Sequence, residues 1–297
     1  MLRWSNIEDA SPTPVSIVMA VHNAATALRQ SLPPLLSLTV GRAELLILLD
    51  QTGDTSLDVI KHTCASTRMP VRVWDQPKPQ WEAASENFLM RQSHATDWFI
   101  SVQPDQIIQE PGWNAVLARP AQQYGDVFAV SARCGHDLNR PGHRGGSNYV
   151  GRCGTEIFKP LRHPPDMRSF HVRGTVNRGP LLMHANRTRE LSYLDADAFP
   201  MDDSEHDLNC RAQQRGWVVG FYPIKVFAPN ELGTKQNATQ LRSASASMIA
   251  KQVYAKRQQL ARDRRPSTCL FKTPSFRQPV EVRNITGTGT GTGTHRD

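Results

Sequence analysis

Short, strongly apolar runs alternate with helix-like segments through roughly the first 130 residues, and this alternation constrains the fold most. The apolar runs, which are typical of strands, are Val15–Val21, Glu44–Asp50, Val71–Trp74, Asp97–Val102 and Asp126–Ala132. Helix-like segments between them are Ala24–Leu38, Thr55–Thr67 and Glu82–His94. Strands this apolar, joined through helices, form a mostly parallel sheet covered on both faces. The sequence therefore predicts an α/β fold.

The second half of the chain is less regular. Residues Arg133–Arg178 are rich in Arg, Gly, His and Pro and show weak periodicity. Regular elements are predicted again at Gly179–His184 (strand), Arg187–Leu194 and Ser204–Arg215 (helices) and Trp217–Tyr222 (strand). Basic helices are expected from about Gln240 to Arg265, and the Gly-Thr repeat at Thr286–Thr294 cannot form a packed core.

This pattern predicts four regions. An N-terminal arm covers residues 1–13, the main α/β domain 14–235, a basic helical extension 236–285 and a disordered tail 286–297. The chain has no apolar run of the ~18 residues that suggest a membrane span, and no apolar leader near Glu8 and Asp9. Its five cysteines show no CxxC spacing, which favours a reducing compartment. We therefore expect a cytoplasmic protein, with a peripheral position at a membrane as an option.

The charge of the chain indicates an anionic partner. Lys and Arg number 35 against 27 Asp and Glu, and the pI is near 9.5. Residues 133–189 hold eleven basic and three acidic side chains, and residues 242–272 hold eight and one. Such charge suits nucleic acid, an anionic membrane surface or a phosphorylated ligand. Nucleic acid is disfavoured, because no helix-turn-helix, zinc, RRM or KH pattern is visible.

Polar residues follow several predicted strands, where α/β sheets bind their ligands. They are His22 and Asn23, then Asp50, then Gln103-Pro104-Asp105, and an acidic cluster at Asp202–Asp207 opens a later helix. Each also has a plain structural interpretation, since aspartates are common in turns and in first helical turns. An acidic crevice in a basic protein suits a divalent metal that holds a diphosphate.

These segments, in this order, resemble the family 2 glycosyltransferases, which have the GT-A fold. The resemblance lies in VSIVMAVHN (residues 15–23), LLDQTGDTSLDVI (48–60), the segment 87–113, and the segment 177–217 with DSEHDLNCRAQQRGW at its end. It covers roughly Val15 to Pro223. The implied fold is a GT-A-like, Rossmann-type, mostly parallel sheet flanked by helices, followed by the basic helical extension.

The resemblance implies a donor site and a metal site. Asp50 matches the residue that binds the nucleotide base, usually uracil, and the loop of Val21, His22 and Asn23 would contact the nucleotide too. It also assigns Asn87 and Gln103 to donor binding. Asp105 matches the metal-binding aspartate, with Mn²⁺ or Mg²⁺ as the metal. Gln103 stands where the first aspartate of the metal motif is expected, which leaves metal dependence open.

The resemblance further implies a catalytic base. Glu205 aligns with the base that takes a proton from the acceptor hydroxyl, and Asp203 or Asp202 could serve instead. One base with in-line displacement predicts inversion at the anomeric carbon. The expected function is transfer of a sugar from a nucleotide-diphosphate donor, UDP-sugar first, to a carbohydrate, lipid-linked or protein acceptor. Two alternatives remain: a non-catalytic nucleotide-sugar-binding relative, and a basic protein that binds nucleic acid or an anionic surface.

Overall fold

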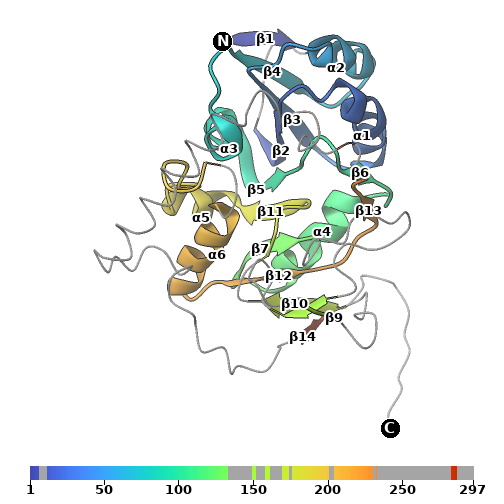
Figure 1. Cartoon of the computed structure of the whole chain (residues 1–297). Helices are drawn as coiled ribbons and strands as arrows, with labels where there is room; N and C mark the ends of the chain where they lie inside the picture. The colour runs from blue at the N-terminus through green and yellow to red at the C-terminus, as the bar shows by residue number, and fades with distance from the viewer. Residues whose placement is uncertain are drawn as a thin grey trace.

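The computed structural model describes residues 1–6, 12–132, 149–151, 158–160, 169–173, 176–200, 204–229, 232 and 282–285. Its centre is a ten-stranded sheet (Figure 1). In spatial order the strands are β1 (Leu2–Ser5), β4 (Val71–Gln76), β3 (Ala43–Asp50), β2 (Thr13–Val21), β5 (Ala95–Ser101), β11 (Leu181–His184), β7 (Val127–Ser131), β12 (Val218–Phe221), β10 (Ser169–Arg173) and β14 (Val282–Asn284).

The four strands β4, β3, β2 and β5 pair in parallel, as the apolar runs predicted. Ile17 of β2 lies opposite Leu45 of β3 and Ile100 of β5. Helices α1 (Ala25–Leu38), α2 (Ser56–Cys64) and α3 (Trp81–Gln92) make the connections between these strands. The carboxyl ends of β2, β3 and β5 therefore meet at one edge of the sheet, which we call the carboxyl edge.

Beyond β5, one strand runs the opposite way. Strand β11 pairs antiparallel with both β5 and β7, and β12 then pairs in parallel with β7. β7 and β12 therefore point in the same direction as β5. Because β11 is reversed, its first residue, Leu181, lies opposite Ser101 at the end of β5. The residues just before Leu181 consequently come to the carboxyl edge.

Alternate residues of the strands pack into two hydrophobic layers, one on each face of the sheet. On one face Ile17 and Met19 pack with Leu28 of α1 and Trp113 of α4 (Trp113–Gln123). On the other face Val18 belongs to the layer formed with α3 and α6 (Ser204–Gln214). Figure 1 shows α1, α2 and α4 on one side of the sheet, and α3, α6 and the short α5 (Ala185–Glu190) on the other.

Loop pairing completes the described fold. Two-stranded ribbons form between β6 (Ile107–Ile108) and β13 (Val226–Phe227), and between β8 (Tyr149–Gly151) and β9 (Phe158–Pro160). Helix α4, which the sequence pattern did not predict, is anchored by fully buried Trp113, whose Nε1 donates to Thr39 Oγ1 at 3.0 Å. The helix carries Pro120 in its interior.

The two edge strands of the sheet come from segments that the sequence pattern placed outside the main domain. Leu2–Ser5, placed in an N-terminal arm, forms edge strand β1 against β4. Val282–Asn284, placed in the basic helical extension, forms edge strand β14 against β10. A sheet edge offers unpaired backbone N–H and C=O groups, so distant segments can add to it without a strong local pattern. The predicted basic helices and the tail lie outside the described residues.

No helix within the described ranges is both long and apolar enough to cross a membrane.

Candidate active site

Hydrogen bonds tie the loops after β2 and β3 to each other. Val21, the last residue of β2, is fully buried, and its carbonyl accepts from Thr52 Oγ1 at 3.1 Å. His22 Nδ1 lies 2.7 Å from the Asp50 carbonyl oxygen. Asn23 adopts a positive φ of 46°, and its Oδ1 accepts from the Gly53 amide at 2.8 Å. These hydrogen bonds thus fix the predicted nucleotide loop in place at the carboxyl edge.

Asp50 ends β3 and holds the first turn of α3. Its side chain is buried, Oδ1 accepts from the Gln80 amide at 2.7 Å, and Oδ2 accepts from the Trp81 amide at 3.0 Å. A carboxylate at this point satisfies amides that have no partner within the helix and complements the positive end of the helix dipole. Asp50 therefore caps a helix in this structure, which is one of the plain structural roles that the sequence also suggested for an aspartate after a strand.

Asn87, another predicted donor residue, has both polar atoms of its side chain occupied. Its Nδ2 donates to the Leu194 carbonyl at 2.8 Å, and its Oδ1 accepts from the Leu194 amide at 3.0 Å. The side chain is buried. It fastens α3 to the segment that follows α5.

The predicted metal loop follows β5 and is ordered by amide contacts. Gln103 Nε2 donates to Glu82 Oε1 at 3.0 Å, and Gln103 Oε1 accepts from Gln106 Nε2 at 3.0 Å. Asp105 lies on the same loop and is half-buried. Within the described residues there is no group of three His, Cys, Asp or Glu side chains placed to hold a metal ion. The donor set here does not fit a metal held by the protein alone, because Asp105 is the one carboxylate of this loop.

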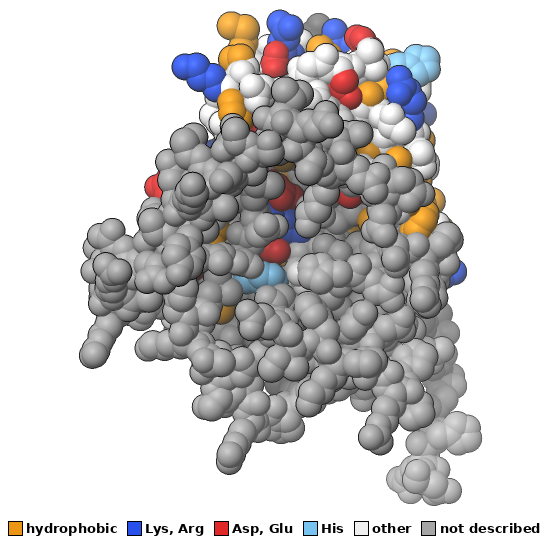
Figure 2. Space-filling model, in the orientation of Figure 1, with side chains coloured by type: hydrophobic (Ala, Val, Ile, Leu, Met, Phe, Trp, Pro, Cys, Tyr) orange, Lys and Arg blue, Asp and Glu red, His pale blue; other side chains and the backbone are white. Residues whose placement is uncertain are grey.

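A buried guanidinium at the carboxyl edge gathers three glutamates, and we call these four residues the Arg178 cluster. Arg178 Nη1 lies 3.1 Å from Glu82 Oε2 and 3.4 Å from Glu205 Oε2, and Arg178 Nε lies 3.3 Å from Glu86 Oε1. Arg178 Nη2 donates to Ser204 Oγ at 2.6 Å. Reversed strand β11 places Arg178 here, three residues before Leu181. On the face drawn in Figure 2, acidic, basic and histidine side chains are visible close together near the middle of the view.

The cluster changes the protonation of Glu86. Burial raises the pKa of Glu86 to about 7, against the opposing effect of Arg178, while Glu82 and Glu205 add to the rise. Ser101 Oγ donates to Glu86 Oε1 at 2.6 Å. Three carboxylates around one cation cannot all ionise cheaply in a buried site, so the cluster holds a proton near neutral pH.

Glu205, the predicted base, lies on the first turn of α6. Its side chain is 9% exposed, and its Oε1 lies 3.7 Å from His206 Nε2. Asp203 and Asp202, the other predicted bases, lie outside the described residues. The structure thus brings Glu205 and Gln103 into one network through Glu82 and Arg178. Asp50, Val21, His22 and Asn23 belong to the neighbouring strand ends.

Sequence reasoning missed Glu82, Glu86 and Arg178. Glu82 and Glu86 stand four residues apart on a predicted helix, so they share one face, and that spacing was a usable signal. Arg178 lies at the end of a segment without periodicity, where nothing local marks it. Only the reversal of β11 brings it to the site.

Comparisons with known proteins bear on the fold. No protein-family model and no curated protein matches the sequence. Among solved structures, the chain is similar to residues 1–349 of S. aureus TarS in complex with UDP, with a TM-score of 0.53 and 10% identity over 72% of this chain and 60% of that one.

Two further structures agree. The mannosyltransferase PcManGT from Pyrobaculum calidifontis, in complex with GDP-Man and Mn²⁺, matches with a TM-score of 0.50 and 13% identity, over 74% of this chain and 56% of that one. GalNAc-T7 with UDP, GalNAc and Mn²⁺ matches with a TM-score of 0.56 and 13% identity, over 74% and 44%. The chain spans less than two thirds of the length of each. These neighbours are GT-A glycosyltransferases, and the chain therefore has the GT-A glycosyltransferase fold.

Proposed function

We propose that the chain is a glycosyltransferase that moves a sugar from a nucleotide-diphosphate donor, UDP-sugar first, to an acceptor hydroxyl with inversion at C1. One observation carries this proposal: Glu205, on the first turn of α6, is held by Arg178 at the carboxyl edge of a GT-A sheet. This is the edge at which open α/β sheets bind their ligands.

The donor lies across the loops after β2 and β3 in this proposal, over Val21, His22 and Asn23. Solved neighbours contain UDP or GDP-Man, which supports this class of donor. In this proposal Asp50 accepts a hydrogen bond from the nucleotide base, although it also caps α3. A carboxylate has about four acceptor positions, and the two backbone amides take two of them. In this proposal Gln103 and Asn87 position the site indirectly. Gln103 binds Glu82, and Asn87 binds the backbone of Leu194.

A divalent cation, Mn²⁺ or Mg²⁺, enters the proposal as a partner of the donor diphosphate, with Asp105 as its protein carboxylate. Mg²⁺ is commonly held by one or two carboxylates together with substrate phosphates. When bound, such an ion neutralises charge on the departing diphosphate. Two solved neighbours contain Mn²⁺, which supports a test of this ion.

The transfer step uses Glu205 as a general base. Its carboxylate takes the proton of the acceptor hydroxyl while the hydroxyl oxygen forms a bond to C1 of the sugar. The bond from C1 to the diphosphate oxygen breaks, and the nucleoside diphosphate leaves with the electron pair. Attack opposite the leaving group inverts C1 through an oxocarbenium-like transition state. Asp203 remains the second candidate for the base.

The acceptor in this proposal is a hydroxyl of a carbohydrate, a lipid-linked saccharide or a protein. The basic residues of the chain suit an anionic membrane surface, where lipid-linked acceptors lie.

A donor panel with matched variants tests the proposal. UDP-glucose, UDP-N-acetylglucosamine, UDP-galactose and GDP-mannose are assayed by thermal shift with and without Mn²⁺, and then for transfer or hydrolysis. We expect at least one UDP-sugar to bind and turn over. Glu205→Gln should lose ~10²–10⁴-fold of the rate and keep donor binding. Glu190→Gln, at an exposed glutamate, is the matched control.

The ion pair of Glu205 also favours a second candidate, a relative that binds nucleotide-sugars without transfer. A base that is 9% exposed and paired with a guanidinium is poorly placed to reach a hydroxyl unless the pair opens. Donor binding without turnover in any metal would select this candidate. Salt-sensitive nucleic-acid binding without affinity for any nucleotide-sugar would contradict both.

A further inference from the structure

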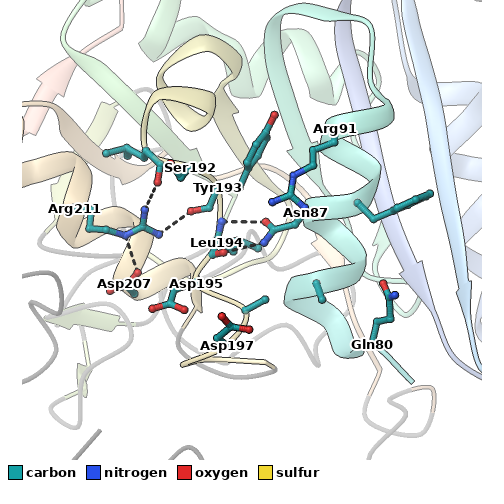
Figure 3. Close-up of a pocket in the computed structure, with 14 residues that line it drawn as sticks. Gln80, Asn87, Arg91, Ser192, Tyr193, Leu194, Asp195, Asp197, Asp207 and Arg211 are labelled. Atoms are coloured by element: carbon teal, nitrogen blue, oxygen red, sulfur yellow. Dashed lines mark hydrogen bonds and ion pairs between the residues drawn. The ribbon is translucent and has the colours of Figure 1, made fainter. Parts of the chain in front are cut away.

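A groove of about 760 Å³ lies between α3 and the segment 191–197 together with α6 (Figure 3). Ala84, Phe88 and Arg91 of α3 form one wall, whereas Glu82 and Glu86 turn to the Arg178 cluster. Residues 84 and 82 are about 200° apart around a helix, so α3 separates the two sites. The volume falls in the range of small-molecule sites, roughly 300–1,000 Å³.

Asp207 lines this groove, and its side chain is 1% exposed. Asp207 Oδ2 lies 2.8 Å from Arg211 Nε, whereas Oδ1 has no hydrogen-bond partner within the described part of the chain. A buried acceptor without a partner is unfavourable, so a hydrogen-bond donor that reached Oδ1 would be bound favourably.

The carboxylates beside Asp207 disfavour an anionic ligand at this point. Asp195 and Asp197 line the groove beside Asp207. Burial raises the pKa of Asp207 to about 6, Arg211 opposes the rise and Asp195 adds to it. The ligand must therefore donate hydrogen bonds, as a hydroxyl or an ammonium group does.

The cations and apolar groups of the groove favour hydroxyls over an ammonium. Arg91 and Arg211 both line it, so a cation would enter beside two guanidinium groups. Arg91 stacks over the Tyr193 ring, with Cζ 5.0 Å from the ring centroid. Phe88 and Leu191 supply apolar surface next to the carboxylates. Alternating apolar and hydrogen-bond-accepting surface matches the C–H and O–H faces of a sugar ring.

We propose that this groove binds a neutral saccharide, with a ring hydroxyl donating to Asp207 Oδ1. Its role as a subsite for the acceptor rests on the proposed function, because Asp207 and the proposed base Glu205 lie on the same turn of α6. The groove would then hold a part of the acceptor that lies away from the reacting hydroxyl.

The test uses the full chain and four neutral probes: the methyl glycosides of glucose, galactose, mannose and N-acetylglucosamine. Binding is measured by saturation-transfer NMR and titration. We expect at least one glycoside to bind, and Ala84→Trp, which fills the groove, to weaken it at least tenfold. Ala115→Trp is the matched control, since Ala115 is an exposed alanine on α4. Asp197→Asn, at an exposed carboxylate of the groove, should weaken binding without a loss of folding.

Asp207→Asn is measured with these variants, and its folding is followed separately. Arg211, the partner of Asp207, also donates to the carbonyls of Leu191 and Tyr193, so this change disturbs the wall itself. Failure of all four glycosides to bind would overturn the proposal. Unchanged binding in Ala84→Trp would also overturn it. Glucosamine and spermidine are measured as cationic probes, and binding of these two without any neutral glycoside would overturn it as well.

UDP binding, measured on the same samples, separates this proposal from the proposed function. Glycoside binding that Ala84→Trp removes, in a chain with no nucleotide affinity, leaves the saccharide site standing and contradicts the transferase. UDP binding and transfer in a chain whose groove binds no glycoside would support the transferase and overturn the saccharide site.

Discussion

Arg178 Nη1 lies 3.4 Å from Glu205 Oε2, so a guanidinium that precedes β11 holds the proposed base on α6. The same nitrogen lies 3.1 Å from Glu82 on α3. Glu82 in turn accepts from Gln103 of the metal-motif loop at 3.0 Å. One cation thus connects three elements that are far apart in the sequence, and changes on any of them should reach Glu205.

Replacing Arg178 by methionine should destabilise the chain strongly. Removing one partner of a buried ion pair typically costs ~3–5 kcal/mol, because the other charges stay buried without compensation. Chemical denaturation measures the change, and Arg178→Lys should recover part of it. Arg215→Met is the control, since Arg215 pairs with Glu190 at the surface and an exposed pair contributes ~0–1 kcal/mol. A methionine variant as stable as the wild type would contradict the assigned role of Arg178.

Glu86 should make the stability depend on pH. Its pKa of about 7 in the folded chain lies above the ordinary 4.5, so the folded state binds more protons between these values. The free energy of unfolding should therefore fall as pH rises from 4.5 to 7, and stay lower above that range. Thermal melts between pH 5 and 8.5 measure it. Glu86→Gln should reduce this slope and leave the part due to Asp207, whose pKa burial also raises, to about 6, whereas the surface variant Glu190→Gln should follow the wild type.

Asn87→Ala should lower stability more than donor affinity. The change removes the partner of the buried N–H of Leu194, which costs ~1–3 kcal/mol, whereas the Leu194 carbonyl keeps its bond from the Ala196 amide. Asn186→Ala, at an exposed asparagine, is the matched control. Thermal melts and UDP titration are compared on both variants. A variant that keeps its melting temperature and loses UDP binding would support the direct donor contact that the sequence resemblance implies.

Gly220→Ala should disrupt the pairing of β12 with β10. A Cβ at Gly220 would lie 2.4 Å from the His171 carbonyl oxygen and 2.6 Å from Phe170 Cζ. Overpacking of this kind costs ~1–3 kcal/mol, and backbone atoms cannot move aside as a flexible side chain can. Gly125→Ala is the control, because a Cβ there meets nothing within 4 Å. Equal melting temperatures for the two variants would contradict this packing.

The parallel half of the sheet could be predicted from sequence, and the other half only in part. Runs such as Val15–Val21 are apolar at every position but Ser16, and such a near-continuous apolar run is typical of a strand buried on both faces. Edge strands β1 and β14 carry no such pattern, since they join the sheet through backbone pairing. Helix α4, with Pro120 inside it, was not predicted either.

The site divides in the same way. The residues at strand ends, Asp50 and Gln103 among them, could be found from sequence because a buried strand is an apolar run, and the change to polar residues marks its end. Their contacts could not: Asp50 caps α3 and Gln103 binds Glu82, across distances that no local pattern encodes.

The sequence by itself determined the alternation of strands and helices, the carboxyl edge and the resemblance to the GT-A glycosyltransferases, because these depend on residues near one another in the chain. Tertiary structure alone decided that Arg178 meets Glu205, and that Asp207 faces a groove while Glu205 faces the cluster. The physical reason for the position of Arg178 is that β11 runs antiparallel to its neighbours. That reversal brings a segment without any periodic pattern to the edge where α3 and α6 begin.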